Sequence, residues 1–361
     1  MKRIILSAAA IMMALHAFDA KACTGITLHT SSGETIPART IEWAGNDIQS
    51  RYVIVPRGYT QRSFTPDGGQ NGLEFTAEYG YVGLAVDQDA FVVDGMNEAG
   101  LTAGLFYFPG YGGYVDYNPA RAARSLSDFQ LVSWILGSFD SIDAVKDAIR
   151  EIDVVAIDPR SSTVHWRITE PGGRQVVLEI IDGKLNFHEN TLGVFTNSPD
   201  FQWHLTNLNN YINLATGPIS SRQFGDHTLS AFGGGSGMLG LPGDMTPPSR
   251  FVRAAFFQMT APRLDSAEET VAQAFHILNS FDIPVGIQFA EGQEIPDIPS
   301  ATQWTVATDI SGRKIYYRTM YNSNIRCIDL SGIDFCKVQF QSAPLDLVKA
   351  QGFEPVRIRK R

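Results

Sequence analysis

Three cysteines and seven histidines among 361 residues leave little material for a metal site. The sequence contains no C-x-x-C pair and no H-E-x-x-H motif, and its histidines are scattered, so a zinc site is not expected. It also lacks G-x-x-x-x-G-K-[ST] and G-x-S-x-G, which leaves a P-loop or an α/β-hydrolase without support. We expect an activity that needs no cofactor.

One stretch does match a nucleotide-binding pattern. GSGMLG, residues 235–240, has the spacing G-x-G-x-x-G. A dinucleotide fingerprint must follow a strand and open a helix. Here the chain runs into LPGDMTPPS, whose prolines prevent a helix until about Ser249. We interpret the stretch as a flexible loop.

Long hydrophobic runs are absent except at the start of the chain. Residues 4–18 are mostly apolar, follow two basic residues and are too short to span a bilayer. Ala20 and Ala22 stand at the −3 and −1 positions of a signal peptidase site. We therefore predict a signal peptide over residues 1–22, a single catalytic domain over 23–361, a periplasmic location and no membrane anchor.

The charge balance is acidic. The formal net charge is −9, and removal of the predicted signal peptide, with its three basic residues and one acidic residue, brings it to about −11. Such a surface argues against nucleic acid and anionic lipid as partners. The basic end RIRKR is short, and we interpret it as a solvated tail.

Cleavage after Ala22 would give Cys23 a free α-amine. Three interpretations remain for such a residue: an acylated lipoprotein cysteine, a structural cysteine, or an N-terminal nucleophile. The lipoprotein box fits poorly, because Ala20 and Lys21 stand where leucine and a small residue are wanted. A free α-amine has a pKa of about 7.7–8.0 and a thiol one of about 8.5. The amine could therefore accept the thiol proton without a histidine.

The other two cysteines frame CIDLSGIDFC. An oxidising compartment would permit a disulfide between Cys327 and Cys336. The alternative is two half-buried thiols on separate strands, and the sequence leaves both open.

Periodicity predicts alternating groups of strands and helices. Each strand run is short and bounded by turn residues, and helical apolar spacing separates the groups, with Ser141 or Asp140 as an N-cap and a capping box at Ser266 and Glu269. This order favours one α+β domain with mostly antiparallel sheets. The predicted strands are 24–30, 34–43, 51–56, 90–95, 162–170, 174–181, 184–189, 302–310, 314–321 and 324–330, and the predicted helices are 127–139, 141–152, 248–259 and 266–281.

A terminal cysteine that hydrolyses amides needs a cation, a carboxylate and an oxyanion donor. ARTIEW offers Arg39 and Glu42, VFTNSPDF offers Asn197 before a proline turn, and LPGDMTPPSRF offers Arg250 at a helix start. Each also has an ordinary interpretation: a surface pair on a strand, a turn residue, and a solvated residue of the first helical turn.

Taken together, these segments resemble the choloylglycine hydrolase family of bile salt hydrolases and penicillin V acylases. The resemblance covers nearly all of the chain after residue 22. The segments that carry it are CTGITLHT, ARTIEW, DGMNEAGL, LGVFTNSPDFQWHLTNLNNY and GMLGLPGDMTPPSRFVRAAF. It implies a four-layer αββα N-terminal nucleophile hydrolase fold and a homotetramer.

The resemblance also implies roles for single residues. Cys23 would be the nucleophile and its α-amine the base, and Arg39 would favour the thiolate. Asn197 would donate to the oxyanion, and Arg250 would complete the polar cluster. Ile41 is a pocket candidate.

Two positions depart from the bile salt hydrolase pattern. Glu42 replaces the usual aspartate that binds the terminal amine, which keeps the charge but adds a methylene. Tyr107 stands where bile salt hydrolases often carry asparagine, and penicillin V acylases resemble this chain there. The N–H of Tyr107 could still serve the oxyanion while its ring lines the acyl pocket. Nearby LFYFPGYGGYVDY could form an apolar wall, or most of its aromatics could belong to the core.

We therefore expect a secreted amidase acting on a small-molecule amide. Glycine- or taurine-conjugated bile salts are the first expectation, with penicillin V as a close alternative and N-acyl homoserine lactones as a remoter one. Two non-catalytic alternatives remain: a lipoprotein that binds amphipathic ligands, and a degenerate member of the family disabled by Glu42.

Overall fold

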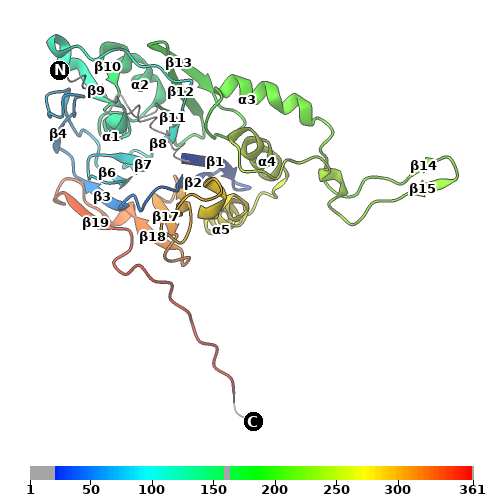
Figure 1. Ribbon diagram of the computed structural model, residues 1–361. Coiled ribbons are helices and arrows are strands. Elements are labelled where there is room, and N and C mark those ends of the chain that lie inside the picture. Colours follow the sequence, from blue (N-terminus) through cyan, green and yellow to red (C-terminus); the bar gives the residue numbers. More distant parts are fainter. Residues whose placement is uncertain (1–20, 158–162, 360–361) are drawn as a thin grey trace, which may run out of the picture.

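Two antiparallel sheets face each other and form the centre of the molecule (Figure 1). The computed structural model describes residues 21–157 and 163–359, so nearly all of the predicted signal peptide lies outside the described residues. The first sheet has the order β1 (Lys21–His29), β2 (Thr35–Trp43), β16 (Thr302–Asp309), β17 (Lys314–Thr319) and β18 (Arg326–Asp329). The second has the order β13 (Lys184–Glu189), β12 (Gln175–Ile181), β11 (Val164–Thr169), β8 (Thr102–Tyr107), β7 (Val92–Asn97), β6 (Tyr81–Ala85), β3 (Arg51–Val55) and β19 (Gln341–Pro344).

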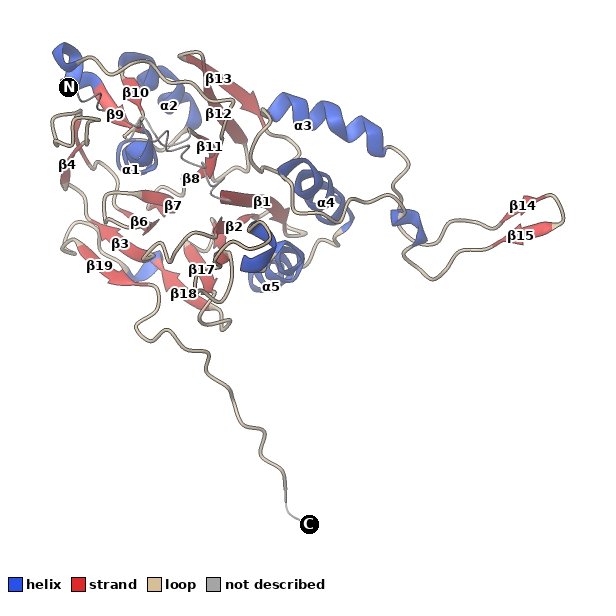
Figure 2. Cartoon of the chain, in the orientation of Figure 1, coloured by secondary structure: helices blue, strands red, loops and turns tan. Residues whose placement is uncertain are grey.

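Helices cover the outer face of each sheet (Figure 2). Helix α1 (Leu131–Ser138), followed by α2 (Ile142–Ala148), packs on β7 and β8 of the larger sheet. Helices α4 (Pro247–Thr260) and α5 (Ala267–Leu278) pack on β1, β2 and β16 of the smaller sheet. The result is the αββα arrangement, in which strand β2 is covered on both sides and buried along nearly its whole length.

Shorter elements connect these layers. Helix α3 (Phe201–Asn207) precedes a long excursion from the body that carries a small hairpin. The hairpin consists of β14 (Arg222–Phe224) and β15 (His227–Leu229), and the other short pairs are β4 (Thr60–Arg62) with β5 (Glu74–Thr76) and β9 (Ser125–Ser127) with β10 (Asp153–Val155). Among the described residues, no helix is both long enough and apolar enough to cross a membrane.

The ten predicted strands and four predicted helices all occur, with small shifts of their ends. Helix α4 begins at Pro247, slightly before the expected Ser249, because the first helical positions need no backbone N–H. At Ser266 the predicted cap is present, since its side chain accepts a hydrogen bond from the N–H of Glu269 at 3.2 Å. Residues 235–240 contain only a short 3₁₀ turn and lead into no nucleotide-binding helix, so the loop interpretation is confirmed.

Three elements near the site escaped the sequence patterns. Strands β6 (YVGLA) and β8 (TAGLFY) contain glycine and alanine, which weaken a strand signal, although both lie inside the larger sheet. Helix α3 follows directly on a proline turn, and Asp200 caps it by accepting from the N–H of Trp203 at 3.0 Å. Cys327 and Cys336 are exposed free thiols, and only Cys327 lies on a strand.

Candidate active site

Cys23 and Arg39 lie side by side at the junction of the two sheets. In the β1–β2 register, Cys23 pairs with Ile41 and Gly25 pairs with Arg39. Because side chains alternate along a strand, Cys23, Arg39 and Ile41 face the larger sheet together. The guanidinium of Arg39 donates from Nη2 to Cys23 Sγ at 2.9 Å. The interpretation of Arg39 and Glu42 as a surface pair is therefore wrong, since both are buried.

Arg39 is fixed by the larger sheet. Its Nη1 donates to the carbonyl oxygens of Leu105 at 2.6 Å and Val93 at 3.2 Å. The carboxylate of Asp94 lies 3.7 Å from Nη1, and the ring of Phe106 lies 4.0 Å from the guanidinium carbon. A fully buried cation requires such compensation. The position of Arg39 relative to the sulfur is thus set by strands β7 and β8.

Packing is close beneath strand β1 at Gly25. A Cβ atom on Gly25 would lie 2.8 Å from Nη1 of Arg167 and 3.1 Å from Phe106. Glycine lets strand β1 approach these two side chains closely, and the charge of Arg167 also acts on Asp94. Asp94 belongs to the DGMNEAGL segment, but nothing in its spacing linked it to Arg39.

Several groups act on the Cys23 thiol. Burial raises its pKa above 9.0, and the nearby Glu42 carboxyl acts in the same direction. The charges of Arg39 and Arg250 and a hydrogen bond from the backbone N–H of Tyr107 oppose that rise. The pKa of Cys23 stays raised overall, and these three groups are the ones that favour the thiolate.

Asn197 brings an amide to Cys23 from the loop between β13 and α3. Its Oδ1 accepts from the backbone nitrogen of Cys23 at 2.8 Å and from Nη2 of Arg250 at 2.7 Å. Its Nδ2 donates to the carbonyl oxygen of Tyr107 at 2.8 Å. One N–H of the amide is thereby engaged, and the second could donate to a reacting group.

Arg250 ties helix α4 to strand β1. Its Nη1 donates to the carbonyl oxygen of Cys23 at 2.6 Å and to Oγ1 of Thr24 at 2.8 Å, and its Nε donates to the carbonyl oxygen of Met245. The residue is fully buried at the start of α4, so its interpretation as a solvated residue is wrong. Its fork of donors fixes Cys23 and Asn197 relative to each other.

Glu42 pairs with Ala22 in the β1–β2 register, one position from Cys23. It is buried, and its Oε1 accepts from Oγ1 of Thr302 at 3.4 Å, while Oε2 has no hydrogen-bond partner among the described residues. Burial raises the pKa of Glu42 to about 7, although the charge of Arg250, the hydroxyl of Thr40 and the charge of Arg39 act against that rise. A buried carboxyl with one free oxygen is suited to bind a cation at this end of β1.

A largely apolar cavity of about 220 Å³ opens beside Cys23 and Glu42. Ile41 and Tyr107 line it, as expected for pocket residues. Of the aromatic stretch after Gly104, Leu105 and Tyr107 face the cavity, whereas Phe106 and Phe108 are core residues. The remaining wall is formed by Trp43, Ile48, Val86, Asp87, Phe91, Val93, Phe129, Ile157 and Val164.

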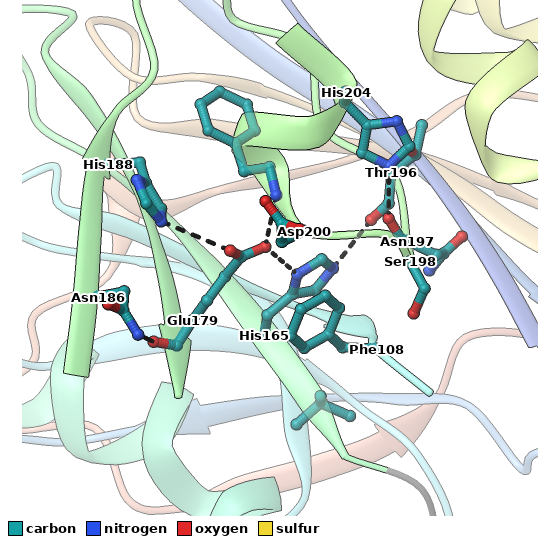
Figure 3. Close-up of polar contacts among 12 residues, drawn as sticks. Phe108, His165, Glu179, Asn186, His188, Thr196, Asn197, Ser198, Asp200 and His204 are labelled. Atoms are coloured by element: carbon teal, nitrogen blue, oxygen red, sulfur yellow. Dashed lines mark hydrogen bonds and ion pairs between the residues drawn. The ribbon is translucent and has the colours of Figure 1, made fainter. Parts of the chain in front are cut away.

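A second layer of polar side chains lies behind Asn197 and was not predicted (Figure 3). His165 on β11 contacts Glu179 on β12, and His204 on α3 contacts the backbone of Asn197. The sequence did carry a signal: Glu179 interrupts the apolar run VVLEII, and a charge in a buried strand needs a partner. No pattern indicated that the partner would be His165.

Comparisons with known proteins agree with this architecture. The family model described as "Linear amide C-N hydrolases, choloylglycine hydrolase family" matches residues 23–340. A bile salt hydrolase/transferase of Clostridium perfringens is 32% identical over 86% of this chain and 92% of its own length. A penicillin V acylase of Pectobacterium atrosepticum is 26% identical over 86% of this chain and 81% of its own.

The structural similarity is equally extensive. A crystal structure of a variant of conjugated bile acid hydrolase from Clostridium perfringens superposes with a TM-score of 0.80 at 28% identity. The superposition covers 93% of this chain and 100% of the chain in that crystal structure. The fold is that of the N-terminal nucleophile hydrolases. The chain belongs to the choloylglycine hydrolase family and is a hydrolase of linear amide C–N bonds.

Proposed function

We propose that Cys23 is the nucleophile and that its own α-amine is the base, in a chain whose first residue is Cys23. The observation that carries this proposal is the 2.9 Å contact between Arg39 Nη2 and Cys23 Sγ at the end of an apolar cavity. The family match also begins at Cys23. A free α-amine at this place could take the thiol proton near neutral pH.

The reaction follows from these positions. The thiolate attacks the amide carbon, a C–S bond forms, and the carbonyl oxygen becomes an oxyanion. Asn197 Nδ2 and the N–H of Tyr107 would donate to that oxyanion, each such donor contributing about 3–4 kcal/mol. The C–N bond then breaks and the amine leaves with the proton held by the α-amine. Water hydrolyses the thioester and restores the thiol.

We assign Glu42 the task of holding the α-ammonium group. Its Oε2 is buried without a hydrogen-bond partner among the described residues. Glu42 also lies opposite Ala22, the residue that cleavage would remove from the end of β1. Arg250 would hold Asn197 and Cys23 in fixed positions relative to each other, because it donates hydrogen bonds to both. This assignment treats Glu42 as a working replacement for aspartate, and not as a disabling change.

The substrate we propose is an N-acyl conjugate with an apolar acyl group. Conjugated bile salts come first, because the relatives that are 30% identical or more carry bile salt or conjugated bile acid hydrolase names. Penicillin V is the second candidate, because Tyr107 lines a cavity whose volume of about 220 Å³ falls below the roughly 300–1,000 Å³ of drug-sized ligand sites. N-acyl homoserine lactones are a more distant candidate.

The deciding experiment compares kcat/KM for glycocholate, taurocholate and penicillin V with protein that begins at Cys23. We expect activity on at least one of them and its loss in Cys23→Ser. Full activity in that variant would remove Cys23 as the nucleophile. A preference for penicillin V would assign the cavity to a flat aromatic acyl group and exclude the bile salt assignment.

We also propose secretion to the periplasm and assembly into a homotetramer. Secretion is supported by the charge and hydropathy of residues 1–22, and intact mass after export would show whether the chain begins at Cys23.

Assembly is supported by the projecting segment 212–239 (Figure 1), since monomers seldom expose so many large apolar side chains on one segment. Those side chains are Ile212, Ile219, Phe224, Leu229, Phe232 and Leu239. Deletion of residues 218–234 should give a smaller particle by light scattering.

A further inference from the structure

The two peptide groups that flank the Cα atom of Asn197 are each held by an imidazole (Figure 3). The carbonyl oxygen of Thr196, in the peptide group before Asn197, lies 3.1 Å from Nε2 of His165. The carbonyl oxygen of Asn197 itself lies 2.8 Å from Nε2 of His204. Fixing both peptide planes fixes the direction of the Cα–Cβ bond between them. The two imidazole rings therefore determine the direction in which the Asn197 side chain points.

Within the part of the chain that the structure describes, no strand pairs with Thr196 or Asn197 to provide this support. Phe195 exchanges two backbone hydrogen bonds with Gly25, at 2.7 and 3.0 Å, and this pairing is an isolated bridge. The chain then turns toward α3, and the next two carbonyl groups point at side chains. A carbonyl oxygen only accepts, so both Nε2 atoms must carry a proton.

His204 is suited to be a permanently neutral donor. Its Nδ1 is buried and has no hydrogen-bond partner among the described residues. Burial lowers the pKa of His204 to about 4, so the ring keeps a single proton, at Nε2, throughout the neutral range. The ring stacks on Phe251 with centroids 4.6 Å apart and an interplanar angle of 10°. Helix α4 thus holds the plane of the donor.

His165 is fixed from its other nitrogen. Its Nδ1 lies 3.1 Å from Oε1 of Glu179, which also accepts from the N–H of Phe201. Burial opposes ionisation of Glu179, but contacts with His165 and His188 outweigh it and hold its pKa at about 2. Burial also lowers the pKa of His165. A neutral His165 ring has one nitrogen without a proton. The lone pair of that nitrogen would face either the carbonyl oxygen of Thr196 or the carboxylate of Glu179, which is repulsive. We therefore assign a proton to each nitrogen of His165.

We propose that His204 and His165 are positioning residues that aim the amide of Asn197 at the oxyanion, with Glu179 fixing the orientation of His165. This inference rests on the proposed role of Asn197. Oδ1 of Asn197 already accepts two hydrogen bonds and Nδ2 already donates one, so a single N–H serves the reaction. Hydrogen bonds weaken steeply with angle, and a rotated Asn197 would lose that donor.

Substitution of His204 provides the test. His204→Phe keeps the stacked ring but removes the donor. We expect kcat to fall about tenfold or more, with KM nearly unchanged. The loss should not exceed the roughly 10²–10³-fold that follows deletion of an oxyanion donor itself. His204→Gln places an amide N–H near the same spot and should recover most of the rate. If the phenylalanine variant does not fold, His204→Asn, whose amide stops one carbon short, replaces it. His276→Phe on the exposed face of α5 is the matched control.

Two further measurements distinguish a misoriented Asn197 amide from a general disruption of the site. In an Asn197→Ala background, His204→Phe should cost nothing more, because its effect passes through Asn197. Alkylation of Cys23 by iodoacetamide forms no oxyanion, so its rate should be the same in His204→Phe as in the unmodified protein. An unchanged kcat, an additive loss or an equally slowed alkylation would overturn the inference. A protein that alkylates normally but hydrolyses no amide would instead overturn the proposed function.

Discussion

Replacing Glu42 with glutamine should have opposite consequences in two forms of the chain. One form retains Lys21 and Ala22, and the other begins at Cys23. In the first form the carboxyl is buried near Arg250 and Arg39, with Oε2 unpaired among the described residues. In the second form an α-ammonium group would lie beside it. The same substitution therefore removes a costly charge in one form and a useful charge in the other.

The magnitude follows from the pKa of Glu42, which burial raises from its ordinary 4.5 to about 7. Below pH 4.5 the group is protonated whether the chain is folded or unfolded, and it has no effect on stability. Between pH 4.5 and 7 the unfolded chain ionises first, so the free energy of unfolding falls as the pH rises. One pKa unit corresponds to about 1.36 kcal/mol, so the loss reaches about 3 kcal/mol above pH 7.

Urea unfolding at pH 4.5 and pH 8 measures this effect. In the form that retains Ala22, Glu42→Gln should be about 3 kcal/mol more stable at pH 8 and nearly unchanged at pH 4.5. In the form that begins at Cys23, the same variant should gain nothing at pH 8 and should lose amidase activity. Glu78→Gln, on an exposed residue, serves as the control. Equal effects in the two forms would refute the pairing of Glu42 with the α-ammonium.

Three other substitutions test the remaining parts of the site. Asn197→Ala should lower kcat by about 10²–10³-fold with little change in KM, measured by steady-state kinetics; an unchanged kcat would exclude the amide as an oxyanion donor. Arg39→Lys should raise the pKa of the Cys23 thiol, so iodoacetamide should react more slowly at pH 7, and an equal or faster reaction would contradict the contact at Sγ. Tyr107→Asn should shift the ratio of kcat/KM values toward glycocholate relative to penicillin V, and a constant ratio would show that this ring does not select the acyl group.

Local pairing explains which parts of the site the sequence could predict. Cys23, Arg39, Ile41 and Glu42 lie on two consecutive strands joined by a short turn. Pairing and alternation bring Cys23, Arg39 and Ile41 to one face, and Glu42 is the next residue along β2. Asn197 and Arg250 lie 174 and 227 residues from Cys23, as the spans of their hydrogen bonds show. No spacing rule connects positions so far apart, and only the resemblance of their segments to a known family did so.

The same reasoning explains what was missed in the fold. A strand is recognised from one sequence segment by its side chains, whereas β6 and β8 are held by neighbours on both sides. The histidines behind Asn197 are a stronger case. Their partners are backbone carbonyl groups of a loop, and no residue type in that loop reveals where its carbonyls point.

The site divides into parts that different layers of the fold control. Cys23 on β1 is held by Arg250 of α4, and Arg39 on β2 is held by β7 and β8. The imidazoles that hold the backbone around Asn197 come from β11 and α3. One wall of the cavity has a separate anchor: the buried amide of Gln303 on β16 donates to the carbonyl oxygens of Trp43 and Asn46 and accepts from the N–H of Ile48. That wall can therefore be reshaped through Ile48 while Cys23 and Asn197 keep their contacts. Such independence fits a family whose members carry both bile salt hydrolase and penicillin V acylase names. We therefore expect the cavity wall to determine the choice of acyl group and the residues around the sulfur to carry the chemistry.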